Sequence, residues 1–189
     1  MKIRALICDF DGTLNNSFGK GIERIGRLCR RRNIPFGKEQ YKKLVGAWGL
    51  PGAKLLEVAL GISEDDAKKF YSDWELIDEI ALSPLIHGAQ EALQFNVENE
   101  VVNTLLTSRN RDDLVHVLKE TGILHQFKIL QTLQDSPFRK PDPRVFDYTF
   151  EQLTREYGIA REECVFVGDT FADIQAGTKA GIRTLVVLT

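Results

Sequence analysis

The segment IRALICDFDGTLNNS, residues 3–17, runs from an apolar stretch into two acidic residues and then a turn. The nearly continuous apolar run up to Cys8 is typical of a central strand in a parallel sheet, which is buried on both faces. Asp9 and Asp11 follow this strand directly. Two carboxylates this close at the end of a buried strand repel each other unless a cation neutralises them. The segment therefore predicts a parallel sheet with a charged site at its edge.

The remainder of the chain supports a parallel sheet. Residues 101–107, 164–169 and 183–188 repeat the apolar pattern of the first strand, and residues 127–133 do so more weakly. Helical patterns separate these segments, at residues 88–96, 111–121, 143–157 and 171–180. Alternating strands and helices are the pattern of an α/β domain with a parallel sheet.

Residues 18–82 interrupt this alternation because they contain helical patterns and no strand pattern. Within them, Ser63 and Asp66 form a capping pair in front of a predicted helix over residues 64–82. We expect a core domain made of residues 1–15 and 86–189 and a helical insertion at residues 16–85. Ligands of open parallel sheets bind beyond the carboxyl ends of the strands, so the insertion is well placed to cover a site there.

Composition narrows the possible functions. The net charge of −2 over 189 residues does not favour binding to nucleic acid or to a membrane surface. No apolar stretch reaches the 18 or so residues that a membrane helix needs, and the first strand begins too early to leave room for a signal peptide. Cys8, Cys29 and Cys164 are widely spaced in apolar surroundings, which indicates free thiols in a reducing compartment. We therefore expect a cytoplasmic protein. Its oligomeric state is left open between a monomer and a homodimer.

Polar residues gather at the ends of the predicted strands. Thr107 and Ser108 follow the second strand of the core, and Asp169 follows a later one, with Asp173 four residues on. Lys140 lies in the loop FRKPDP that opens a helix. Together with the two aspartates of the first strand, these residues would collect carboxylates, hydroxyls and one ammonium in a single crevice. Mg²⁺ suits such a site because it prefers oxygen ligands and binds one or two carboxylates together with substrate phosphate.

The same residues divide naturally into chemical roles. Asp9 is a candidate nucleophile, and Asp11 is a candidate acid and base that protonates a leaving alkoxide and then activates water. Thr107 and Lys140 would hold the oxygens of a transferring phosphoryl group. The turn at Gly12 and Thr13 and the amides near Ser108 would bind its other oxygens.

Four motifs resemble those of the haloacid dehalogenase-like hydrolase superfamily, in the same order and over nearly the whole chain. They are DFDGTL at residues 9–14, LLTS at 105–108, KPDP at 140–143 and GDTFADIQAGTKAG at 168–181. Among the branches of this superfamily, the motifs most resemble those of the phosphoglycolate phosphatase-like branch. An isolated motif of this kind is commonly a cap, a turn or a loop, but four together favour a functional site.

The resemblance implies a Rossmann-like core, flanked by helices, with an inserted α-helical cap. It also implies a Mg²⁺-dependent phosphatase that acts on a small phosphorylated metabolite through an aspartyl-phosphate on Asp9. By motif position, the metal ligands would be Asp169, Asp9 and the main-chain carbonyl of Asp11. Asp173 would support the metal site directly or through water.

Several alternatives stay open at the level of sequence. Arg109 would either reach a substrate anion or pair with Asp112 or Asp113 in the following helix. A phosphomutase of the β-phosphoglucomutase kind would use the same four motifs, with a sugar hydroxyl in place of water as acceptor. A non-catalytic binding module of the same fold is the alternative from another class.

Overall fold

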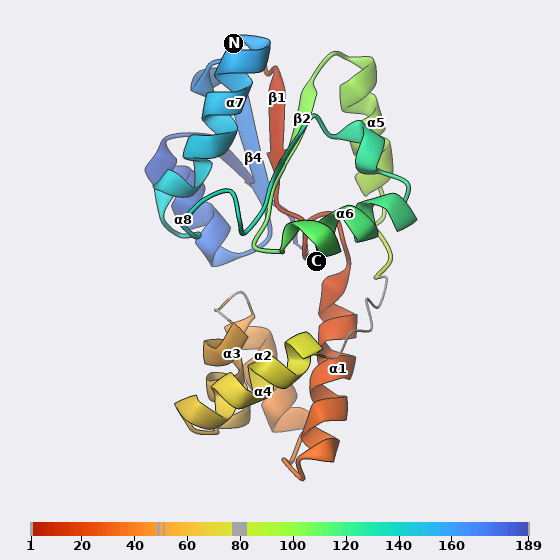
Figure 1. Cartoon of the computed structure of the whole chain (residues 1–189), viewed down its shortest axis with the longest axis vertical. Helices are drawn as coiled ribbons and strands as arrows, with labels where there is room; N and C mark the ends of the chain where they lie inside the picture. Colours follow the sequence, from red (N-terminus) through yellow and green to blue (C-terminus); the bar gives the residue numbers. More distant parts are fainter. Residues whose placement is uncertain (1, 49, 51, 77–82, 189) are drawn as a thin grey trace. The chain divides into compact units, whose positions relative to one another are not determined.

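The computed structural model describes residues 2–48, 50, 52–76 and 83–188 of the chain. It divides into two compact units (Figure 1). We call residues 1–17 with 82–189 the core unit and residues 18–81 the helical unit. That the helical unit covers a site on the core unit remains a prediction.

In the part of the core unit that the structure describes, one sheet has five strands in the order β3-β2-β1-β4-β5. Every neighbouring pair runs parallel, which confirms the predicted α/β fold. The strand from the opening segment lies at the centre of the sheet, between β2 and β4. The strands are β1 (Ala5–Cys8), β2 (Val102–Leu106), β3 (Ile129–Gln131), β4 (Cys164–Gly168) and β5 (Arg183–Val186).

Helices cover both faces of this sheet (Figure 1). On one side lie α7 (Asp147–Tyr157) and α8 (Phe171–Ala180), and on the other lie α5 (Ala89–Glu98) and α6 (Arg111–Glu120). Successive side chains of a strand point to opposite faces, so β1 contributes to two cores. Ile7 packs in the cluster that includes Phe146 and Phe166, whereas Cys8 packs in the cluster that includes Leu93 and Leu105. Burial on both faces explains why these strands are apolar almost throughout.

The last strand differs from this expectation. The segment at residues 183–188 was predicted as a strand of the same buried, central kind, but β5 is an edge strand. Leu185 is 53% exposed and Val186 is 42% exposed. An edge strand and a central strand have the same apolar composition here, and only the pairing order separates them.

Three helices of the core unit begin at side chains that cap them. The side chain of Asn110 accepts a hydrogen bond from the amide of Asp113 at the start of α6, and Thr170 does the same for Asp173 at the start of α8. Asp142 caps the short helix that follows the KPDP loop. The α-helices are α5 (Ala89–Glu98), α6 (Arg111–Glu120), α7 (Asp147–Tyr157) and α8 (Phe171–Ala180); the 3₁₀-helices are η1 (Leu124–Gln126), η2 (Pro143–Phe146) and η3 (Arg161–Glu163).

The described residues of the helical unit form four helices around a core of its own, with Ile25, Leu56 and Phe70 fully buried. Ser63 accepts a hydrogen bond of 3.2 Å from the amide of Asp66, which confirms the predicted cap. The predicted continuation of that helix over residues 77–82 lies outside the described residues. The helices are α1 (Ser17–Arg31), α2 (Lys38–Ala47), α3 (Gly52–Leu60) and α4 (Glu64–Leu76).

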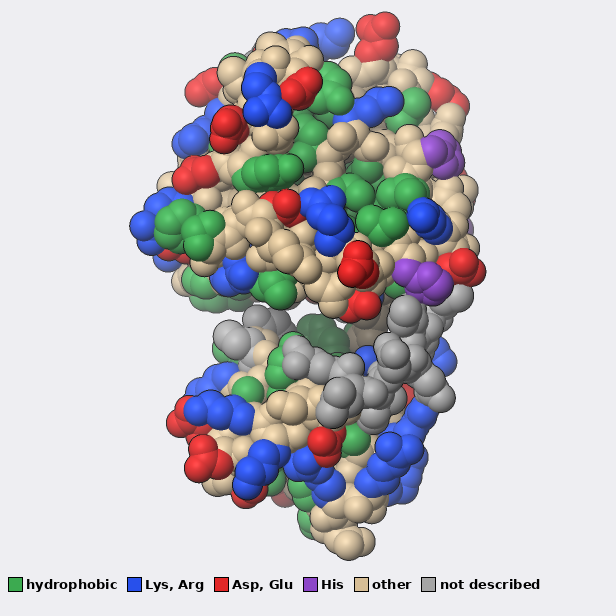
Figure 2. All heavy atoms as spheres, viewed as in Figure 1, with side chains coloured by type: hydrophobic (Ala, Val, Ile, Leu, Met, Phe, Trp, Pro, Cys, Tyr) green, Lys and Arg blue, Asp and Glu red, His purple; other side chains and the backbone are tan. Residues whose placement is uncertain are grey.

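The surface of the protein carries charges of both signs (Figure 2), and its three cysteines are buried. Figure 2 shows Lys and Arg side chains interspersed with Asp and Glu over the face in view. None of the described helices is both long enough and apolar enough to cross a membrane. Cys8, Cys29 and Cys164 are buried free thiols, as predicted.

Candidate active site

The carboxyl ends of β1, β2 and β4 bring the predicted polar residues to one edge of the sheet. These strands are neighbours and run parallel, so the residue after each one lies at the same edge. The ladder continues one residue beyond β1, because the amide of Asp9 donates to the carbonyl of Val167 over 2.8 Å. The amide of Thr107 similarly donates to the carbonyl of Gln131 over 3.0 Å. These backbone hydrogen bonds therefore fix the Cα positions of Asp9 and Thr107 at the edge of the sheet.

A buried cation joins two of the aspartates. Nζ of Lys140 lies 3.0 Å from Oδ1 of Asp9 and 2.6 Å from Oδ1 of Asp173. The three side chains are at most 9% exposed. Breaking such a pair leaves an uncompensated charge in a poorly solvated place, so the three groups hold one another in position.

Asp169 lies beside this group and is held by the turn after β1. Its Oδ1 accepts a hydrogen bond of 3.1 Å from the hydroxyl of Thr13. Gly12 has φ +78, and a Cβ added there would lie 2.1 Å from Oδ2 of Asp169. Glycine is thus required at this turn both by the backbone conformation and by the close approach of the carboxylate.

The position of Asp173 follows from local sequence. Thr170 and Asp173 form a reciprocal capping box at the start of α8, in which Oδ2 of Asp173 accepts from the amide of Thr170 over 2.9 Å. The other carboxylate oxygen is thereby left to face Lys140. Oxygens of Asp9, Asp169 and Asp173 all lie within 4.8 Å of one another.

The charges of this cluster do not balance. Burial raises the pKa of Asp9 to about 7, with the neighbouring Asp173 adding to the effect and Lys140 opposing it. Burial and Asp173 likewise raise the pKa of Asp169 to about 6. The pKa of Lys140 is raised in spite of its burial, because two carboxylates face it. One ammonium against three carboxylates leaves negative charge uncompensated, so these oxygen ligands fit a hard divalent cation.

Asp11 lies in a different electrostatic setting from Asp9. Nε of Arg109 donates to Oδ2 of Asp11 over 2.6 Å, and Nη2 of Arg109 donates to Oδ1 over 2.7 Å. Burial by itself would raise the pKa of Asp11, but the hydrogen bonds and charge of Arg109 outweigh it and hold this pKa below its ordinary value. The carboxylate of Asp11 is not among the three that form the cation-fitting cluster.

This pair is the contact that sequence reasoning missed. Arg109 was expected to reach a substrate anion or to pair with Asp112 or Asp113, whereas its guanidinium is bonded to a residue 98 positions away. The sequence carries a weak signal for it, since Arg109 follows the second motif at a strand end adjacent to that of Asp11. Ser108, the remaining predicted residue, is exposed beside the buried Thr107.

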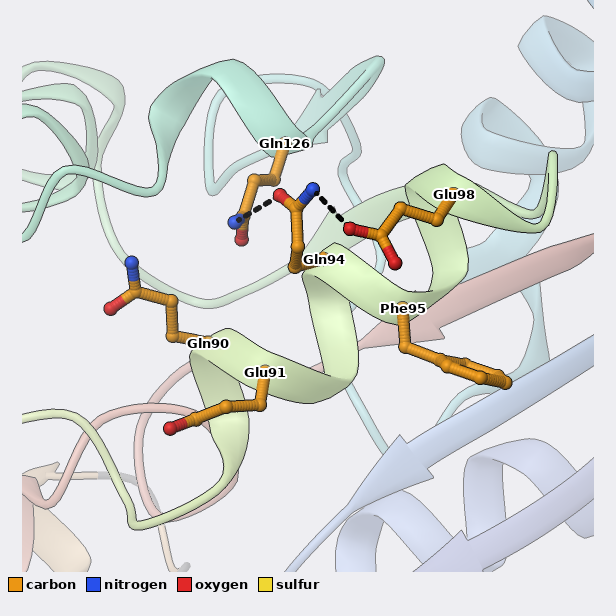
Figure 3. A pocket seen from close by; sticks show the side chains of 6 residues that line it. All are labelled: Gln90, Glu91, Gln94, Phe95, Glu98 and Gln126. Atoms are coloured by element: carbon orange, nitrogen blue, oxygen red, sulfur yellow. Dashed lines mark hydrogen bonds between the residues drawn. The ribbon is translucent and has the colours of Figure 1, made fainter.

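Away from this edge, a groove lies over the outer surface of α5 (Figure 3). Its lining is mainly amide and carboxylate groups. Gln94 donates a hydrogen bond of 2.9 Å to Glu98 and accepts one of 3.4 Å from Gln126. Phe95 is 64% exposed there. None of the predicted site residues lines this groove, so we assign the chemistry to the sheet edge.

Comparison with known proteins agrees with this geometry. The family model described as haloacid dehalogenase-like hydrolase matches residues 6–187. Pyrophosphatase PpaX from Listeria monocytogenes serotype 4a is 25% identical over 189 residues, which cover 97% of this chain and 82% of the relative. Validoxylamine A 7'-phosphate phosphatase from Streptomyces hygroscopicus subsp. limoneus is 26% identical, covering 95% of this chain and 83% of the relative.

A solved structure has the same fold. It is described as a predicted phosphoglycolate phosphatase from Haemophilus somnus and is 25% identical in sequence. The match has a TM-score of 0.79 and covers 98% of this chain and 85% of the other. The likeness therefore extends over both units and is not limited to the motifs.

Proposed function

The chain belongs to the haloacid dehalogenase-like hydrolases, and on that premise we propose that it hydrolyses small phosphate monoesters through an aspartyl-phosphate formed on Asp9. The observation that carries the proposal is the buried cluster in which Lys140 pairs with both Asp9 and Asp173 beside Asp169. The names of the relatives, which include phosphatases of small molecules, support the substrate class.

The first step would form a covalent intermediate. A carboxylate oxygen of Asp9 attacks phosphorus, and the bond from phosphorus to the ester oxygen breaks. The leaving oxygen takes a proton from Asp11 and departs as the alcohol, so Asp11 must be protonated in the reacting complex although Arg109 favours its ionised form in the free protein. The ammonium of Lys140 and the hydroxyl of Thr107 would hold the oxygens of the phosphoryl group during this transfer.

The second step would restore the enzyme. Water gives a proton to Asp11 while its oxygen attacks phosphorus, and the bond between phosphorus and Asp9 breaks. Inorganic phosphate leaves, and both aspartates return to their starting states. Burial of Asp9 limits the access of water to the intermediate, so water would enter from the side of Asp11.

Mg²⁺ is the cofactor that we propose for this site. Asp9, Asp169 and Asp173 would hold it, since their oxygens lie within 4.8 Å of one another and carry more negative charge than Lys140 neutralises. When bound, Mg²⁺ supplies positive charge that offsets the charge of the phosphoryl group.

Release of phosphate from a panel of phosphorylated metabolites tests the proposed function. We expect the purified protein with Mg²⁺ to release inorganic phosphate selectively from a subset of the panel, and excess EDTA to stop this release. Product analysis distinguishes the phosphomutase alternative, which would yield an isomerised sugar phosphate in place of free phosphate. A wild-type protein that transforms no ester of a broad panel would contradict the proposal and favour a binding module.

The raised pKa values of Asp9 and Asp169 predict a pH dependence of stability. The folded protein keeps protons on Asp9 and Asp169, with pKa values of about 7 and about 6, where the unfolded chain has released them at its ordinary value near 3.8. The contribution of these groups is therefore complete below pH 4 and is lost as the pH rises through the folded values. In EDTA, we expect the melting temperature to fall between pH 5 and pH 8 by this contribution.

Added Mg²⁺ would reverse that fall, because the metal binds the ionised carboxylates. Thermal melting at pH 5 and pH 8, with EDTA or with Mg²⁺, measures both effects without reference to activity. The stabilisation by Mg²⁺ should be larger at pH 8, and Asp169→Asn should diminish it. Equal stabilisation at both pH values, or none at either, would contradict the metal assignment.

A further inference from the structure

Arg109 is fixed by contacts on three sides. Its Nε and Nη2 are 2.6 Å and 2.7 Å from the two oxygens of Asp11. Its amide donates to the hydroxyl oxygen of Thr107 over 3.2 Å, and its guanidinium carbon lies 5.3 Å from the centre of the Phe10 ring. Two parallel hydrogen bonds fix the plane of a carboxylate as well as its distance, which a single bond does not.

The pairing leaves little of the Asp11 carboxylate unoccupied. Besides the two bonds from Arg109, Oδ1 accepts a third from the side-chain amide of Asn15 over 3.2 Å, and the side chain of Ser17 also bonds this carboxylate. A carboxylate offers about four acceptor directions, so these neighbours fix its orientation. The Asp11 side chain is nevertheless 36% exposed.

Arg109 commits one of its two-pronged faces to Asp11. The nitrogens Nε and Nη2, which form the lateral face of the guanidinium, both bond Asp11, so this pair leaves only the N–H groups at the Nη1–Nη2 end for another ligand. Turning the lateral face to a phosphate would leave a half-buried carboxylate without its cation. The geometry therefore ties the lateral face of Arg109 to the acid and base.

We propose that Arg109 is a positioning residue that aims Asp11 at the ester oxygen, and that it acts on the reaction through Asp11 without binding the transferring phosphoryl group. The proposal rests on the proposed function, because it assigns Asp11 the proton transfer to the leaving group. It also makes the effect of Arg109 depend on the leaving group. An alkoxide needs the proton, whereas p-nitrophenolate leaves readily without one.

The test compares kcat/KM for two esters, since kcat/KM reports the steps up to departure of the alcohol. We expect Arg109→Gln to lower kcat/KM about 10- to 100-fold for an alkyl phosphate and by at most about threefold for p-nitrophenyl phosphate, because a positioned acid contributes about 10²–10⁴ only where the proton is needed. In an Asp11→Asn background, Arg109→Gln should cause no further loss with the alkyl ester.

Two further variants sharpen the comparison. Arg109→Lys keeps the charge but loses the two-pronged contact, so it should lose nearly as much as Arg109→Gln with the alkyl ester. Arg111→Gln is the matched control, since Nη2 of Arg111 bonds the carboxylate of Asp135 over 2.6 Å and 2.8 Å outside the site. It should leave both esters unaffected.

The outcomes separate this inference from the proposed function. The positioning role would be overturned if Arg109→Gln lowered kcat/KM equally for both esters, or if its loss added to that of Asp11→Asn. Recovery of kcat/KM in Arg109→Lys would overturn it too. Each of these results would show that Arg109 binds substrate. Unchanged rates with both esters would overturn it as well. A wild-type protein that hydrolyses neither ester nor any member of the metabolite panel would instead overturn the proposed function on which it rests.

Discussion

Replacement of Asp9 by asparagine is expected to abolish phosphate release, with a loss of at least about a thousandfold, because the amide cannot form the covalent intermediate. The fold should survive, since asparagine has the same shape and removes one of three crowded carboxylates. Burial raises the pKa of Asp9 to about 7, so its ionised form opposes folding at pH 8 in the absence of metal. The variant should therefore melt no lower than wild type at pH 8 in EDTA.

Phosphate release and thermal melting of the same preparations measure both parts of this prediction. Asp112→Asn is the control, because it makes the same chemical change at an exposed carboxylate in the first turn of α6. Purifying both variants identically also excludes a contaminating phosphatase. Turnover by Asp9→Asn near the wild-type rate would rule out Asp9 as the nucleophile.

Replacement of Lys140 by methionine is expected to affect both activity and stability. It would leave Asp9 and Asp173 buried without the cation that lies 3.0 Å and 2.6 Å from them. Removing one partner of a buried ion pair costs about 3–5 kcal/mol, because the remaining charge is uncompensated. Loss of a group that offsets the charge of the phosphoryl group should lower kcat at least about 100-fold.

Denaturant unfolding in EDTA and phosphate release in Mg²⁺ measure these two losses. Lys128→Met is the control, because it replaces the same side chain by the same residue at an exposed position of the core unit. Mg²⁺ should recover part of the lost stability, because it places positive charge among the same carboxylates. Unfolding at the wild-type denaturant concentration in EDTA would show that Lys140 does not stabilise the cluster.

The architecture of the core could be read from the sequence because its signals are local. An apolar run such as residues 3–8 predicts a strand buried on both faces, and β1 is the central strand of the sheet. The capping pair of Ser63 and Asp66 marked the start of α4 for the same reason, since a cap bonds an amide only two or three positions away. The edge position of β5 was missed because pairing order has no signal within the strand.

Part of the candidate site was equally local. Asp9 and Asp169 follow strands that the sequence identifies, and parallel strands bring such positions to a common edge. Thr170 and Asp173 form a capping box within one turn, which sets the direction of the Asp173 carboxylate. These positions needed only the order of residues along the chain and the rule that parallel strands share a carboxyl edge.

Other features depended on distances between segments far apart in the chain. Lys140 reaches Asp9 and Asp173 across 131 and 33 residues, and Arg109 reaches Asp11 across 98. Lys140 and Arg109 each lie near several acidic residues in the sequence. Sequence spacing alone therefore could not identify the acidic partner of either cation. The tertiary structure decided which carboxylate each cation meets, because charge interactions in a buried site depend on separations of a few ångströms that residue order does not specify.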